Sequence, residues 1–249
     1  MDRQFAANYH NLYKDHWRWR AREYLILAAI EEIQRRRSTA KILDVGCGDG
    51  LFFEHLSRFG DVEGIEPDQS LLSDDGPWRH RIYASPFDST FQPGKRYSLI
   101  LMLDVVEHVR DAGNFLICAL RLLDRGGTLI LTVPAFPSLW TSHDDLNQHF
   151  KRYTKKTLSD MASQVGMKVL TSRYFFHWIF PLKLLLHWKE SFFGAQSLVP
   201  GVPPGWINEV LLYVSLAEQK LFRYICLPFG SSMIAICEKE SICHRSTRS

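Results

Sequence analysis

No stretch of the sequence is long and apolar enough to predict a transmembrane helix. The best candidate spans residues 175–186, and His177, Pro181 and Lys183 interrupt it. Residues 1–4 also lack the apolar core of a signal peptide. From these two absences we expect a cytoplasmic protein.

Cysteine content and net charge are both low. The cysteines at positions 47, 118, 226, 237 and 243 form no CxxC pair and several fall in apolar runs, so we expect reduced, mostly buried thiols. The net charge is +3 over 249 residues, which is too small to indicate a nucleic-acid partner. The length suits one α/β domain with elaborations.

One stretch is strongly patterned: residues 42–50 read Ile-Leu-Asp-Val-Gly-Cys-Gly-Asp-Gly. The apolar run passes into glycines at 46, 48 and 50, and helical residues follow, which predicts a buried parallel strand, a tight turn and a helix start. Glycine allows positive φ and the close approach of a ligand. Free N–H groups at the helix start favour an oxygen-rich ligand.

A dinucleotide site is the first alternative for such a turn. Its G-x-G-x-x-G fingerprint requires a third glycine where this chain has Leu51. An oxidoreductase that binds a nicotinamide cofactor is therefore disfavoured.

Strands alternate with helices after the glycine turn, which predicts a parallel sheet with helices on both faces. The expected strands are residues 40–45, 61–66, 81–84, 97–103 and 128–133. Ligands bind beyond the carboxyl ends of such strands. Because Gly46, Glu66, Phe87 and Asp104 all lie at or after these ends, we expect them to line one crevice.

Four segments together resemble the motifs of class I methyltransferases, which use S-adenosylmethionine (SAM). These segments are residues 43–50, 65–66, 103–109 and 122–129. The resemblance implies an α/β fold, a Rossmann-like seven-stranded and mostly parallel sheet with helices on both faces. It also implies a reversed last strand, which we expect at residues 233–237.

The resemblance further implies a role for each strand end. Gly46 and Gly48 would bracket the methionine part of SAM, and Glu66 would hold the ribose, since a carboxylate accepts hydrogen bonds from both hydroxyls. Asp104 would lie beside the sulfonium. The full set expected to bind SAM is Asp44, Gly46, Cys47, Gly48, Glu66, Pro67, Asp68, Phe87, Leu103 and Asp104.

Methyl transfer from a sulfonium is an in-line displacement, for which the enzyme aligns donor and acceptor and excludes water. A hydroxyl acceptor must also lose a proton, and histidine is the natural base near neutral pH. We expect His143 or His149 as the base, with His108 as the next candidate, because all three follow predicted strands. The alternative for each is a hydrogen-bonded structural histidine.

A divalent metal is a weaker alternative. Asp104, Glu107 and His108, with a later histidine, offer oxygen and nitrogen ligands for an ion that would polarise the acceptor hydroxyl. The Val-Glu-His run of residues 106–108 is widespread in metal-free members of the class, so we expect no metal.

Two segments supply candidate acceptor contacts. Residues 16–22 interleave aromatic and basic side chains, which indicates either an anionic or ring-bearing ligand or arginine stems covering core tryptophans. Residues 149–154 resemble a His-x-Arg-Arg-Tyr-like segment of a bacterial subgroup linked to glycan, lipid or quinone modification. The candidates are Trp17, Arg20, Arg152 and Tyr153.

We expect one methyltransferase domain over residues 1–240, with a helical cap at 1–38, a lid or insert at 174–223 and a disordered tail at 241–249. The aromatic stretch 174–193 predicts a lid helix packed on the sheet, with an interfacial helix that reaches a lipid-linked substrate as the alternative.

The predicted activity is O-methylation of a small-molecule or a lipid- or glycan-linked acceptor. We expect no nucleic-acid partner, and a peripheral membrane contact stays open. A nucleic-acid or protein methyltransferase is disfavoured by the low net charge and by the lack of an Asn/Asp-Pro-Pro-Tyr/Phe motif after residue 103. A SAM-binding module without turnover is the remaining alternative.

Overall fold

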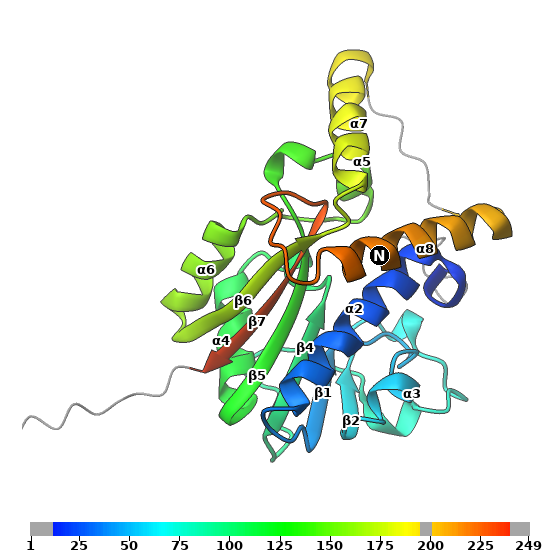
Figure 1. The fold of residues 1–249 in the computed structure, drawn as a ribbon. Helices are drawn as coiled ribbons and strands as arrows, with labels where there is room; N and C mark the ends of the chain where they lie inside the picture. The colour runs from blue at the N-terminus through cyan, green and yellow to red at the C-terminus, as the bar shows by residue number, and fades with distance from the viewer. Residues whose placement is uncertain (1–11, 195–200, 240–249) are drawn as a thin grey trace, which may run out of the picture.

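A computed structural model describes residues 12–194 and 201–239. Its core is a seven-stranded sheet in the order β3-β2-β1-β4-β5-β7-β6 (Figure 1). The strands are β1 (Lys41–Val45), β2 (Asp61–Ile65), β3 (Ile82–Tyr83), β4 (Tyr97–Leu103), β5 (Leu123–Pro134), β6 (Met167–Phe175) and β7 (Ser232–Lys239). β7 pairs antiparallel with both β5 and β6, and the other pairs of this sheet are parallel, so the predicted mostly parallel sheet with a reversed last strand is confirmed.

Helices cover both faces of the sheet (Figure 1). The helices are α2 (Trp17–Gln34), α3 (Phe53–Leu56), α4 (Ala112–Leu122), α5 (Ser142–Leu146), α6 (Lys155–Gln164), α7 (Ile179–Phe193) and α8 (Gly205–Leu221). Short 3-10 turns are η1 (Gln69–Leu71), η2 (Arg79–Arg81), η3 (Val106–His108) and η4 (Pro137–Leu139).

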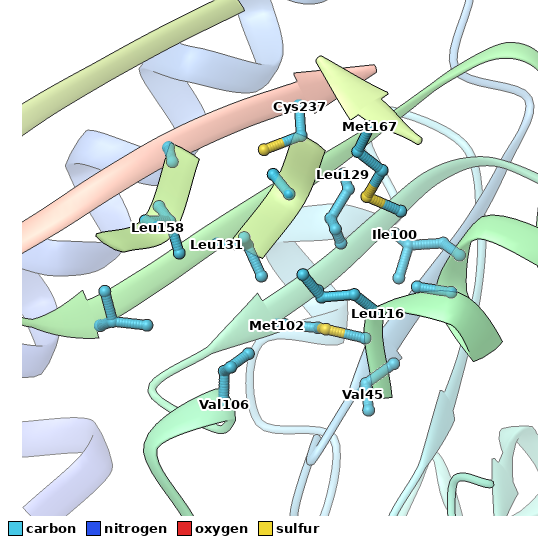
Figure 2. Packing of buried hydrophobic residues seen from close by; sticks show 14 of the residues in the cluster. Val45, Ile100, Met102, Val106, Leu116, Leu129, Leu131, Leu158, Met167 and Cys237 are labelled. Carbon is cyan, nitrogen blue, oxygen red and sulfur yellow. The ribbon is translucent and has the colours of Figure 1, made fainter. Parts of the chain in front are cut away.

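Side chains of the central strands alternate between two apolar cores, as the pleat requires. Ile100 and Met102 of β4 pack with Leu116 of α4 on one face, as Figure 2 shows. Leu99 and Leu101 pack on the other face with residues of α2 and α3. Because both faces are covered, a strand that is apolar throughout is stable here, and the carboxyl ends are left to form the site.

Strand boundaries agree closely with the sequence prediction except at β5. That strand begins at Leu123 instead of residue 128, because Leu123 pairs with Tyr97 before a register shift. The predicted tail at 241–249 lies outside the described residues.

The stretch 174–193 differs from its prediction. It does form a helix, α7, but none of that helix's residues is buried, and Figure 1 shows it extending away from the sheet. An apolar helix of this kind is predicted to be buried from its composition, but α7 contacts η4 and α5 instead of the sheet. No helix in the described parts of the chain is both long and apolar enough to cross a bilayer.

Candidate functional site

A cavity of about 650 Å³ lies at the carboxyl ends of the central strands, beside the start of α2. This volume falls in the range of roughly 300–1,000 Å³ that small-molecule and cofactor sites occupy. All ten residues predicted to bind SAM line it, as do Trp17 and the three histidines 108, 143 and 149. The structure therefore brings these residues together, while their contact with SAM stays a prediction.

The glycine turn after β1 is sterically constrained. Gly46 has φ +73°, and a Cβ at this position would lie 2.7 Å from Cγ2 of Val105. Any other residue would have to adopt a left-handed backbone and displace Val105, which follows β4. The turn and the end of β4 are thus packed together across the cavity floor.

Glu66 connects the end of β2 to this turn. Its Oε2 accepts the N–H of Gly48 at 3.0 Å and its Oε1 accepts the N–H of Asp68 at 2.9 Å. The residue is 5% exposed, and burial raises its pKa while the two N–H donors partly oppose this rise. Each carboxylate oxygen retains capacity for a further hydrogen bond, which suits the two hydroxyls of a ribose.

Asp104 holds a strained backbone at the end of β4. It has φ +56°, and its side chain accepts hydrogen bonds from Thr132 Oγ1 at 2.8 Å and from the guanidinium of Arg22. Burial raises its pKa, but the charges of Arg22 and Arg18 outweigh this effect and lower it below the usual value. Gln148 and Phe176 also combine positive φ with a place in the cavity wall, and such strain concentrates at functional sites.

Asp44 lies under the glycine turn and is 4% exposed. Burial raises its pKa to about 7, although the charge of Arg22 lowers it. Arg22 thus acts on both Asp44 and Asp104, at the point where β1 and β4 end.

A buried ion pair orients one histidine that lines the cavity. Asp144 is fully buried and receives two hydrogen bonds of 2.9 Å from Arg152, from Nε to Oδ1 and from Nη2 to Oδ2. Nδ1 of His149 lies 2.8 Å from Oδ1 of the same carboxylate. Burial raises the pKa of Asp144, but the His149 hydrogen bond and the Arg152 charge hold it well below its usual range.

Because Asp144 stays ionised, Nδ1 of His149 carries a proton, and this N–H donates a hydrogen bond to the carboxylate. In the neutral form of the ring, Nε2 is then the acceptor, which is the arrangement of a general base. The sequence prediction chose His149 without recognising Asp144, which lies five residues before it on α5.

The other two histidines are less suited to that role. Burial and the neighbouring His149 lower the pKa of His108 to about 4, and the two ring centroids are 4.7 Å apart. Burial lowers the pKa of His143 to about 3, and its Nε2 lies 3.0 Å from the amide Nδ2 of Asn147. The accepting nitrogen of His143 is therefore already engaged.

Glu107, His108 and His149 form a cluster that offers metal ligands. One ligand atom from each residue lies within 4.8 Å of the others. Burial raises the pKa of Glu107 well above its usual value, and its Oε2 has no hydrogen-bond partner within the described residues. The donor set fits a divalent cation, but Asp104, which the sequence suggested as a further ligand, is bound to Arg22 and Thr132.

Three predicted acceptor contacts do not line the cavity. Arg20 pairs with Glu209 of α8, and the phenol of Tyr153 is buried with its oxygen 3.4 Å from the carbonyl of Val106. Arg152 is 2% exposed and, besides Asp144, bonds the carbonyl of Ala135 at 2.9 Å. All three have structural partners, so the geometry does not support their predicted contact with an acceptor.

Two other arginines of residues 16–22, Arg18 and Arg22, do line the cavity, and the sequence prediction did not include them. Residues four apart lie on one face of a helix, whereas Arg20 lies between them in sequence and points to the other side. The i, i+4 spacing of the cavity-lining pair was the available signal.

A family model described as "Methyltransferase domain" matches residues 17–172. The ubiquinone biosynthesis O-methyltransferase of Azorhizobium caulinodans is 33% identical over 99 residues, which are 37% of this chain and 39% of that protein. The mitochondrial ubiquinone biosynthesis O-methyltransferase of Homo sapiens is 33% identical over 106 residues, 37% of this chain and 28% of that one. The matches thus span well under half of these relatives.

Solved structures resemble the whole fold. A SAM-dependent methyltransferase from Archaeoglobus fulgidus superposes with a TM-score of 0.52 at 16% identity, covering 87% of this chain and 94% of that one. Magnesium protoporphyrin IX methyltransferase from Synechocystis PCC 6803, solved with bound S-adenosylhomocysteine (SAH), gives a TM-score of 0.57 at 11% identity, covering 94% of each chain. At such low identity these likenesses establish the fold alone.

Proposed function

Because the chain belongs to the methyltransferase domain family, we propose that it transfers a methyl group from SAM to a hydroxyl of a small-molecule acceptor, with His149 as the base. The family confirms the enzyme class and the cofactor predicted from the sequence. The observation that carries the finer proposal is that His149, which bonds the buried Asp144, lines the same cavity as the glycine turn and Glu66.

The residues present fit SAM. Glu66 would hold the ribose, the turn at Gly46 would receive the methionine part, and Phe87 would provide an apolar wall for the adenine. Bound SAM supplies an electrophilic methyl group on a sulfonium. The chain itself aligns the acceptor, excludes water with the apolar side chains of the cavity, and takes the hydroxyl proton at Nε2 of His149.

Replacing Glu66 with glutamine is expected to weaken SAH binding about 10- to 100-fold, since an amide nitrogen cannot accept the N–H bonds and ribose hydroxyls that a carboxylate accepts. Isothermal titration calorimetry with SAH measures the change. Glu63→Gln is the matched control, because this β2 carboxylate bonds Lys95 and Tyr97 and does not line the cavity. Equal affinity in wild type and Glu66→Gln would contradict the ribose assignment.

Two observations support oxygen as the methylated atom. A deprotonating base is needed for a hydroxyl, and the buried Asp144 provides His149 with the orientation for it. The curated relatives that match part of the chain are named O-methyltransferases.

We further propose that the acceptor is lipid-linked and is presented at an anionic membrane surface. The outward face of α8 is apolar, whereas its inward face buries polar side chains such as Asn208 and Ser215. The exposed large apolar residues of α8 follow helical spacing and are Trp206, Val210, Tyr213, Val214 and Leu221. On α7 the exposed apolar residues are Leu182, Leu185, Leu186, Trp188, Phe192 and Phe193. Exposed apolar stripes of this kind, rich in tryptophan and tyrosine, are typical of interfacial helices.

The charges of these helices favour anionic lipid. Glu190 accepts hydrogen bonds from the N–H and the hydroxyl of Ser142, and Glu218 accepts the N–H of Trp178. The remaining acid, Glu209, is paired with Arg20. Exposed Lys189 and Lys220 have no ion pair within the described parts of the chain, whereas Glu190 is half-buried and Glu218 is buried, so the two lysines are the charges that this surface presents to lipid.

We expect the chain to co-sediment with vesicles that contain phosphatidylglycerol and to bind neutral phosphatidylcholine vesicles more weakly, since each nearby basic residue contributes about 1 kcal/mol on anionic lipid. The double variant Val210→Asp with Tyr213→Asp should lose binding. Leu170→Asp is the control, because this exposed leucine lies on β6. If the double variant binds vesicles normally, or if the wild-type chain dimerises through this face instead, the membrane proposal is wrong.

A further inference from the structure

The guanidinium of Arg18 lies at the end of the cavity that is remote from the glycine turn. Its Nη2 is 3.4 Å from Oγ of Ser232, the first residue of β7, and its Cζ is 5.8 Å from the ring centroid of Phe176, which follows β6. In the sheet, β7 is three strands away from β1, a separation of about 14 Å. Arg18 therefore lies on the acceptor side of the cavity.

Arg18 has little to neutralise it. The 3.4 Å contact with a hydroxyl is its one side-chain hydrogen bond, and it makes no ion pair, within the part of the chain that the structure describes. The two carboxylates near enough to attract Arg18 already form ion pairs with other arginines, Asp104 with Arg22 and Asp144 with Arg152. Arg18 is half-buried, and a cation that is partly withdrawn from water without a partner is costly, so a binding partner from outside the chain would offset this cost.

A neighbouring lysine responds to the charge of Arg18. Burial, and after it the charges of Arg152 and Arg18, lower the pKa of Lys183 on α7 well below its usual value, so this amine loses its proton more readily. Burial also lowers the pKa of Arg18, although guanidinium groups stay charged in proteins. An anion bound here would face Arg18 directly and would sit on the same side as His143 and His149, which also line the cavity.

We infer that Arg18 binds an anionic group, a carboxylate or a phosphate, of the methyl acceptor. This inference rests on the proposed function and narrows its acceptor to an acid or a phosphate ester that carries a hydroxyl. The planar fork of a guanidinium matches both anions through paired hydrogen bonds.

The carboxylate of SAM is the competing anion for Arg18. Arg22 is better placed for that group, since it lies one helical turn further along α2, bonds Asp104 and acts on Asp44 beneath the glycine turn. An Arg18 variant therefore distinguishes the two sources of the anion. It loses binding of the probe anion if Arg18 contacts the acceptor, and it loses binding of SAH if Arg18 contacts the carboxylate of SAM.

The test uses the full chain saturated with SAH. It is titrated with inorganic phosphate, followed by ³¹P line broadening, and separately with benzoate, followed by line broadening of its ¹H signals. We expect wild type and Arg20→Gln to bind a probe and Arg18→Gln to bind it at least about tenfold more weakly, as loss of a charge-assisted pair predicts. Arg20→Gln is the matched control, because that arginine is on the same helix but outside the cavity. Affinity for SAH should stay within about twofold in both variants.

Equal probe binding in Arg18→Gln, or no probe binding by wild type, would overturn the inference. A loss of SAH binding in Arg18→Gln would overturn it too, because Arg18 would then hold SAM. Arg18→Lys keeps the charge and should restore part of the probe binding, which separates recognition from a folding defect. Failure of the wild type to bind SAH would instead contradict the proposed function, so the two failures are distinguishable.

Discussion

Replacing His149 with glutamine is expected to lower the rate of methyl transfer about 10²- to 10⁴-fold, the usual contribution of a general base. SAH affinity should be nearly unchanged, because His149 is not one of the residues expected to hold SAM. Glutamine fills a similar volume but cannot take a proton at the position of Nε2. The measurement is transfer of labelled methyl from SAM to a hydroxylated acceptor fraction, under single-turnover conditions.

His80→Gln is the control for this experiment, since His80 is exposed in η2 and does not line the cavity. Asp144→Asn should reproduce most of the loss, because the asparagine amide no longer holds the Nδ1 proton of His149 in place. A full rate in His149→Gln would show that the acceptor needs no base at this position.

The same assay decides between a base and a metal. Activity should survive EDTA if His149 acts as the base. If EDTA abolishes transfer and Mg²⁺ restores it, the cluster of Glu107, His108 and His149 is a metal site, and the expectation of no metal is wrong.

Replacing Arg152 with methionine is expected to lower the free energy of unfolding by about 3–5 kcal/mol, because it leaves the Asp144 carboxylate buried without its bidentate partner. The loss should shift the thermal midpoint by on the order of 10 °C for a chain of this size. Urea denaturation followed by circular dichroism measures it. The activity of the folded variant should also fall, since Asp144 orients His149.

Arg20→Met provides the comparison. The Arg20–Glu209 pair is partly exposed, with 33% and 44% of the two side chains accessible, and such pairs contribute roughly 0–1 kcal/mol. A similar loss in both variants would mean that the Arg152–Asp144 pair has no special structural role.

The strands of the sheet could be predicted because each one is marked by a short pattern of neighbouring residues in the sequence. Each central strand is a short apolar run, and β1 and β4 end at Asp44 and Asp104 or close to them, so the strand ends could be placed without knowing any tertiary contact. The rule that these ends meet at one edge then placed Gly46, Glu66, Phe87 and Asp104 around one cavity, and the resemblance to class I methyltransferases supplied the rest of the ten residues.

The acceptor side was harder because it depends on contacts between segments. Arg152 was assigned to the acceptor, but it bonds Asp144, which lies eight residues earlier on α5. The two side chains come together because the chain after α5 folds back on that helix. Arg20 was chosen over Arg18 because composition does not reveal helical phase, which the structure determines through the contact of α2 with α8. For α7, composition predicted packing on the sheet, whereas the helix extends away from it.

A crystal structure with SAH bound tests the central claim most directly. The account predicts the ribose hydroxyls within hydrogen-bond distance of Glu66 and the sulfur beside Asp104, facing the side of the cavity where His149 lies. An SAH molecule whose ribose lies away from Glu66, or whose sulfur is sealed off from His149, would contradict it.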